Sequence, residues 1–162
     1  MKVSDLRGRQ VVSLEKADKI GEVDHVLLDL QKQQAVALKV KPLGFFTSDK
    51  ILSWSGITSI GEDAVTIQSA SLLQEGNDAP LSSYPSAASL SGSKVMTQDG
   101  QQVGSVGDVD IDIPGGQVTA YLLSEGLLAG LTGKQREVPT SEVVSVSQNM
   151  LVVQNQAVRN DS

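Results

Sequence analysis

Hydrophobic residues occur along this chain in short runs and alternations that are bounded by Gly, Asp, Ser or Gln. The three-to-four-residue spacing of an amphipathic helix is hard to find, whereas alternation over a few residues indicates β-strands. The pattern therefore predicts an all-β protein. Its strands are expected at residues 10–14, 19–30, 35–40, 50–54, 64–68, 94–97, 102–113, 118–123, 136–139 and 151–154.

Turn signals separate these strands. Asp99-Gly100 and Pro114-Gly115-Gly116 predict hairpins, because glycine adopts positive φ without steric cost. Residues 55–60 and 141–146 fit either a helical turn or a further strand. The hydrophobic pattern stops after residue 69, and the turn-rich composition that follows predicts a linker over residues 71–88.

The second half of the chain repeats the first. Residues 6–12, 20–30, 34–38 and 57–67 recur in the same order as residues 90–96, 103–113, 117–121 and 143–153. A period of about 85 residues is too long for a solenoid unit and suits a small domain. We expect one module over residues 1–70, a second over residues 89–157, and a frayed tail over residues 158–162.

Each module has five or six short strands, and a sheet of that size buries both faces only by closing on itself. The predicted fold is therefore two tandem small β-barrels joined by a linker. A small barrel has little apolar area to bury, so we expect the two to pack together as a pseudo-symmetric pair, with a homodimer as a further possibility.

The repeated motif resembles the PRC-barrel domain. It opens with Leu6-X-Gly8-X-X-Val11-Val12 and continues with Ile20-Gly21-X-Val23-X-X-Val26. The family is named after the cytoplasmic part of the photosynthetic reaction centre H subunit, and it also occurs at the C-terminal end of the small-subunit ribosome maturation factor. The Pro-Trp of the family is split here, as Ser53-Trp54 in the first module and Pro139-Thr140 in the second. The resemblance implies PRC-type barrels that act as non-catalytic docking modules.

Composition narrows the possible functions. The chain of 162 residues has no cysteine, and its formal net charge of -6 argues against nucleic-acid binding, which needs clustered Lys and Arg. Nine basic and ten acidic side chains precede Asn77, against four and nine from Asn77 onward. Only the first module could offer a basic patch, formed by Lys39, Lys41 and Lys50. We expect a cytoplasmic protein without stable membrane insertion, because neither a signal peptide nor a membrane-spanning stretch is evident.

Two loops at matching positions combine glycines with bulky apolar residues, where loops are ordinarily polar. Exposed apolar clusters of this kind mark contact surfaces, although the same loops could fold over a barrel end or pack against the other module. As partner-binding residues we assign those in and beside the loops: Phe45, Phe46, Lys50, Leu127, Leu128, Leu131 and Lys134.

Other motifs favour structural roles. Gly130 to Lys134 departs from a phosphate-binding loop at Leu128 and Gln135, so no nucleotide site is predicted. Asp108, Asp110 and Asp112 share one face of a strand, which we interpret as a solvated outer face rather than a weak cation site.

His25 is the single histidine, and we place it at a surface strand position without a catalytic or metal-binding role. Trp54 is expected in the core or at a barrel end. We predict no catalytic residues, metal or cofactor. A protein-binding adaptor or scaffold with an unidentified protein partner is the main hypothesis. A peripheral membrane or photosynthetic-complex accessory is the alternative, and an enzyme the third.

Overall fold

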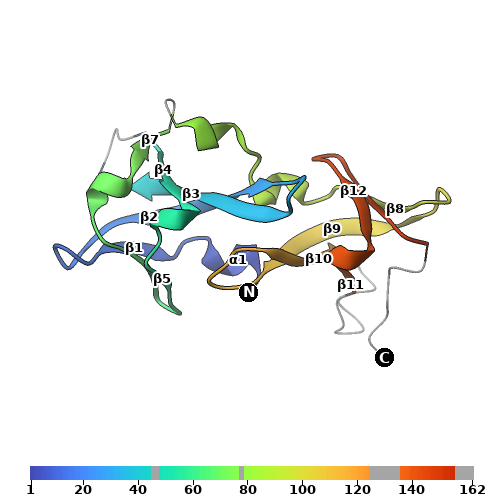
Figure 1. Ribbon diagram of the computed structural model, residues 1–162, viewed down its shortest axis with the longest axis horizontal. Helices are drawn as coiled ribbons and strands as arrows, with labels where there is room; N and C mark the ends of the chain where they lie inside the picture. The colour runs from blue at the N-terminus through green and yellow to red at the C-terminus, as the bar shows by residue number, and fades with distance from the viewer. Residues whose placement is uncertain (45–47, 77–78, 125–135, 156–162) are drawn as a thin grey trace.

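The computed structural model describes residues 1–44, 48–76, 79–124 and 136–155, which form two β-sheets lying end to end (Figure 1). The first sheet has the order β5-β6-β1-β2-β3-β4-β7 and the second the order β11-β10-β9-β8-β13-β12. The strands of the first sheet are β1 (Gln10–Ser13), β2 (Asp18–Asp29), β3 (Gln34–Pro42), β4 (Lys50–Ser53), β5 (Ser59–Ile60), β6 (Ala64–Ile67) and β7 (Gln74–Glu75). Those of the second are β8 (Lys94–Thr97), β9 (Gln102–Ile111), β10 (Val118–Ser124), β11 (Glu137–Pro139), β12 (Val143–Val146) and β13 (Met150–Val153).

The all-β prediction is confirmed, and each expected strand is present with its ends shifted by at most a few residues. The two ambiguous segments contain both alternatives. A short 3-10 helix precedes a strand in each, as η1 (Trp54–Gly56) before β5 and η5 (Thr140–Glu142) before β12. The tail at residues 158–162 and its predicted fraying lie outside the described residues.

The repeat in sequence is also a repeat in strand order. Read from β4 to β5, the first sheet matches the second read from β11 to β12, and β7 is an addition to the first. Irregularities match as well, since the pairing of β2 with β3 shifts between Val23 and His25, and that of β9 with β10 shifts between Val106 and Asp108. Gly8 and Gly92 have φ of +88° and +86°, which explains the glycine in both copies of the opening motif.

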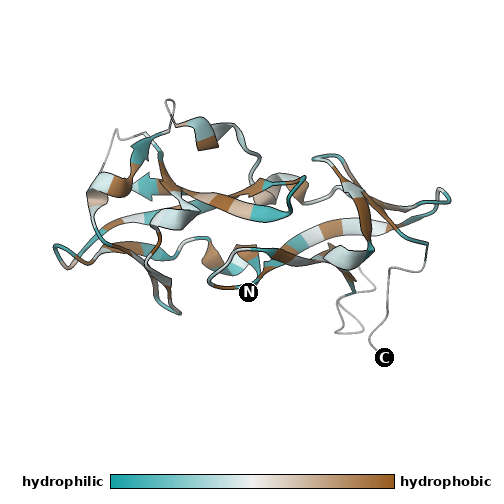
Figure 2. Cartoon of the chain, in the orientation of Figure 1, coloured by the Kyte–Doolittle hydropathy of each residue, from teal (hydrophilic) through white to brown (hydrophobic). Residues whose placement is uncertain are grey.

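The expectation that each barrel closes on itself is wrong in detail. Among the described residues the end strands β5 and β7, and likewise β11 and β12, do not pair with each other. The physical reason is that the two sheets share a core. One continuous hydrophobic cluster contains Leu6, Val23 and Leu38 together with Val106 and Tyr121, so each sheet buries part of its apolar surface against the other. Hydrophobic positions recur along the strands of both sheets (Figure 2).

The segment that connects the sheets is itself packed. It contains three 3-10 helices, η2 (Ala70–Leu72), η3 (Pro80–Ser83) and η4 (Ala87–Leu90), together with β7. Ala79, Leu81 and Tyr84 cover a small second cluster around Leu27 and Ile51. The connecting segment therefore packs on one face of the first sheet.

The segment that precedes the first strand of each repeat crosses to the other repeat. The helix α1 (Val3–Leu6) lies over β9, and the Ile111 N–H donates to the carbonyl of Met1 at 2.8 Å. Continuing the Leu6–Leu90 match backwards pairs Met1 with Pro85, and the Leu28 N–H donates to the Pro85 carbonyl at 2.9 Å. Because Leu28 and Ile111 are equivalent in the repeat, the exchange is reciprocal.

Candidate functional site

The two predicted docking loops follow β3 and β10. Phe45 and Phe46 of the first loop lie outside the described residues, as do Leu127, Leu128, Leu131 and Lys134 of the second. The structure does describe the stem of the first loop. Leu43, directly after β3, is 53% exposed, and Lys50 begins β4.

The stem of the first loop is braced by β7. The register places Glu75 opposite Lys50, and the Lys50 ammonium forms an ion pair with the Glu75 carboxylate. This hydrogen bond, together with the Lys50 charge, lowers the pKa of Glu75 below its ordinary value. Lys39 approaches Asp49 at 3.6 Å, and the Gly76 N–H donates to the Asp49 carbonyl at 3.1 Å. The stem is therefore held from both sides.

A hollow of about 600 Å³ opens beside this stem. Asp49 and Ile51 of the stem form one wall, and Ser82, Tyr84 and Ser86 of the connecting segment form another. The lining combines hydroxyl groups, an aromatic ring and an aliphatic side chain. Such a surface can accept both apolar and hydrogen-bonding groups of a partner.

The repeats meet at the turns of their long hairpins. The Val118 N–H donates to the Gln33 carbonyl at 2.8 Å, and the Ala35 N–H donates to the Gly116 carbonyl at 2.9 Å. The repeat relates these two bonds to each other. Trp54, expected in the core or at a barrel end, is half-buried at this junction, where its Nε1–H donates to the Pro114 carbonyl at 2.9 Å.

A buried tyrosine reinforces the junction. The Tyr121 hydroxyl donates to the Gln33 Oε1 at 2.9 Å, and burial raises the pKa of Tyr121 to about 12. The side chain is fully covered by the shared core. This bond links the second repeat to the turn of the first.

Asp108 and Asp110 of β9 differ from the prediction of a solvated face, whereas Asp112, which follows β9, is exposed as predicted. Asp108 accepts hydrogen bonds from the backbone and hydroxyl of Ser4, and Asp110 lies 2.8 Å from the Met1 ammonium. Asp112 accepts from the Gln117 N–H at 2.6 Å. The crossing N-terminal segment covers two of the three, which the local alternation of β9 cannot reveal. Among the described residues, no cluster of three or more His, Cys, Asp or Glu side chains could hold a metal.

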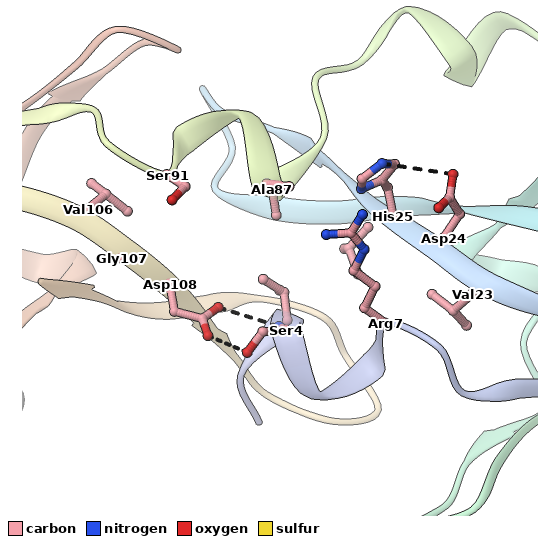
Figure 3. A pocket seen from close by; sticks show the side chains of 13 residues that line it. Ser4, Arg7, Val23, Asp24, His25, Ala87, Ser91, Val106, Gly107 and Asp108 are labelled. Atoms are coloured by element: carbon pink, nitrogen blue, oxygen red, sulfur yellow. Dashed lines mark hydrogen bonds and ion pairs between the residues drawn. The ribbon is translucent and has the colours of Figure 1, made fainter. Parts of the chain in front are cut away.

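A smaller cavity of about 380 Å³ lies between the repeats (Figure 3). His25 lines it with a half-buried side chain, so the predicted surface strand position is only partly right. Arg7, Ser4 and Ser91 also line this cavity, and none of them was predicted as a site residue. The sequence gives little indication of their role, because they belong to the two crossing segments, which contact residues far away along the chain.

These features define a duplicated all-β protein whose two repeats are joined through one core. Its sequence matches the model of the PRC-barrel domain twice, over residues 1–74 and 86–159. The chain therefore belongs to the PRC-barrel domain family.

Similar proteins include one from Bacillus subtilis and one from Pseudomonas aeruginosa. One is the "Probable sporulation protein YlmC" of Bacillus subtilis (strain 168), 31% identical over 62 residues that cover 36% of this chain and 76% of that protein. The other is a crystal structure from Pseudomonas aeruginosa of a RimM-type 16S ribosomal RNA processing protein. It has 12% sequence identity and a TM-score of 0.33, and the match covers 94% of this chain and 97% of that one. In the described part of this chain, no helix has the length and hydropathy required to cross a membrane.

Proposed function

We propose that this protein is a non-catalytic adaptor or scaffold that binds a protein partner through the loops after β3 and β10. The observation that carries the proposal is the braced stem of the first loop. Contacts among the described residues hold the stem, since Lys50 pairs with Glu75 and Asp49 is contacted by Gly76 and Lys39. Binding residues are commonly carried on loops that a rigid scaffold positions.

The surroundings of the stem favour a protein partner. Leu43 is exposed at the start of the loop, Phe45 and Phe46 follow in the sequence, and the hollow beside the stem adds Tyr84 and several hydroxyl groups. Aromatic residues together with hydrogen-bonding groups at a concave surface are typical of protein interfaces. Among the described residues the second sheet has no counterpart of β7, which supports the first repeat as the main docking site.

We also propose that the two modules act as one pseudo-symmetric unit. The paired hydrogen bonds of Gln33 with Val118 and of Ala35 with Gly116, and the reciprocal crossing of the N-terminal segments, support this arrangement. A partner would then meet a scaffold of fixed shape, which reduces the ordering cost of binding.

The test compares the intact chain with a Phe45→Ser, Phe46→Ser double variant as baits in affinity purification. Leu14→Ser is the matched control, because Leu14 is 47% exposed in a different turn. We expect a protein partner that the intact chain and the control retain and the double variant loses. Recovery of the same partners by all three baits, or binding to lipid vesicles in place of a protein, would contradict the proposal.

Unfolding of the same double variant separates docking from internal packing. A docking role leaves the free energy of unfolding within about 0.5 kcal/mol of the intact protein, as expected for surface substitutions. Phenylalanines packed against the sheets would instead cost about 2 to 5 kcal/mol. Chemical denaturation followed by circular dichroism measures this difference.

A further inference from the structure

The cavity of about 380 Å³ lies where equivalent surfaces of the two repeats face each other. Part of its apolar lining comes in matched pairs, since Val23 is equivalent to Val106 and Val3 is equivalent to Ala87. All four residues are buried. The volume falls within the range of small-molecule sites, which is roughly 300 to 1,000 Å³.

Matched bulges shape the walls of this cavity. Asp24 is the extra residue of β2 where its pairing with β3 shifts, and Gly107 is the extra residue of β9 at the equivalent place. Both line the cavity. A bulge redirects the neighbouring side chains, and here His25 and Asp108 line the cavity beside the two bulges.

The polar lining, in contrast, differs between the repeats. Arg7 of the first repeat is equivalent to Ser91 of the second, and His25 is equivalent to Asp108. One wall therefore carries a guanidinium and an imidazole, with Asp24 lying 3.8 Å from the His25 Nε2, and the facing wall carries a carboxylate. The two walls of the cavity therefore share equivalent apolar residues, but they differ in the charged groups that they carry.

Both walls carry hydrogen-bonding groups that are available to a ligand. The Arg7 side chain makes no hydrogen bond or ion pair within the described part of the chain, and its guanidinium extends toward His25 (Figure 3). A guanidinium offers five N–H donors in a fork that matches a carboxylate. Asp108 Oδ2 accepts only from the Ser4 hydroxyl, so lone pairs remain for another donor.

We propose that this cavity binds one small zwitterionic molecule of the amino acid type. Its carboxylate lies at Arg7 and His25, its ammonium group lies at Asp108, and its short hydrocarbon part contacts Val23 and Val106. This site contains none of the docking-loop residues and shares only His25 with the hollow beside their stem, so it does not depend on the proposed scaffold function.

The experiment titrates the ¹⁵N-labelled full-length protein with ω-amino acids, from glycine to 6-aminohexanoate, and records amide chemical shifts. Hexanoate and hexylamine serve as probes that carry one of the two charges each. We expect saturable shifts at Asp24, His25 and Gly107 with one preferred chain length, and weaker binding of both single-charge probes. That preferred length reports the separation of the two charged walls.

Variants locate the binding. Arg7→Gln should weaken binding of the preferred amino acid roughly ten- to a hundred-fold, the effect of losing one hydrogen bond to a charged group. Asp108→Asn should remove the preference for the amino acid over hexanoate. Ser91→Leu, which narrows the cavity without removing a charge, tests the site independently if the Asp108 variant fails to fold. Lys94→Gln, at an exposed strand position outside the lining, is the control and should bind normally.

The proposal is overturned if none of the probes produces saturable shifts at the cavity amides. It is equally overturned if Arg7→Gln and Ser91→Leu bind the preferred probe as the intact protein does, or if hexanoate and hexylamine bind as tightly as the amino acids.

Discussion

Gly116 provides a sensitive test of how the repeats meet. Its φ is +78°, and a Cβ added there would lie 2.6 Å from Cε2 and 2.8 Å from Nε1 of Trp54. Gly116→Ala therefore creates two problems at once, a backbone conformation that L-residues disfavour and a collision with a side chain of the other repeat. Gly100→Ala is the matched control, because Gly100 has φ of +89° and nothing within 4 Å of the added Cβ.

The magnitudes follow from these two environments. Left-handed backbone in an alanine costs about 1 to 2 kcal/mol, and this is the whole expected effect of Gly100→Ala. In Gly116→Ala the indole must move by about 1 Å, which adds an overpacking cost of about 1 to 3 kcal/mol. It also endangers the bond from Nε1 to Pro114, worth about 1 kcal/mol. We expect Gly116→Ala to exceed the control by about 2 to 3 kcal/mol in the free energy of unfolding.

Urea unfolding followed by far-UV circular dichroism measures both variants. Trp54 is the single tryptophan, so its fluorescence spectrum reports the displaced ring directly. Removing the ring should relieve the collision, and a cycle of Gly116→Ala with Trp54→Ala should show a coupling of about 2 kcal/mol. Equal destabilisation at Gly116 and Gly100, or a coupling near zero, would refute the packing of Trp54 of the first repeat on the turn of the second.

Three further predictions concern other contacts. Burial raises the pKa of Tyr121 to about 12. The neutral Tyr121 hydroxyl therefore contributes fully to the free energy of unfolding below the ordinary tyrosine pKa of about 10, and this contribution is lost as pH rises through about 12. Urea unfolding at alkaline pH should show this loss in the intact protein and not in Tyr121→Phe. Lys50→Ala should return the pKa of Glu75 toward its ordinary value in an NMR titration, with Glu22 as a reference that stays unchanged. Fragments 1–76 and 77–162 should form a one-to-one complex in size-exclusion chromatography with light scattering, because they share one core, and a failure to associate would contradict that core.

The strands could be predicted from the sequence because alternating burial requires alternating apolar and polar residues along each strand. In β1, for example, Val11 is buried and Val12 is only partly so, and the equivalent pair Val95 and Met96 repeats this pattern. The repeat itself fixed the number of modules for the same reason. Closure of the sheets could not be predicted, because it depends on what covers their apolar faces, and here each sheet finds part of that cover in the other repeat.

The cavity between the repeats could not be predicted from the sequence for a different reason. Arg7 and Ser91 flank short helical segments whose contacts lie on the opposite repeat, and no local periodicity records such a crossing. Asp108 likewise appeared solvated because Ser4, its hydrogen-bond partner, is distant along the chain. The equivalence of Arg7 with Ser91 and of His25 with Asp108 was readable in the repeat, but its meaning depends on the cavity that brings these four together.

The reciprocal crossing of the N-terminal segments has a consequence for how the protein folds. The bond between Met1 and Ile111 spans 110 residues, and it closes one of the longest loops the chain can make. During synthesis, the first repeat must therefore wait for β9 to leave the ribosome before its own leading segment is in place. Contacts of such long range slow folding, because loop-closure entropy is lost before they form. Until then Leu6 lacks part of its native surroundings, so the first half of the nascent chain carries an exposed apolar segment for much of its synthesis.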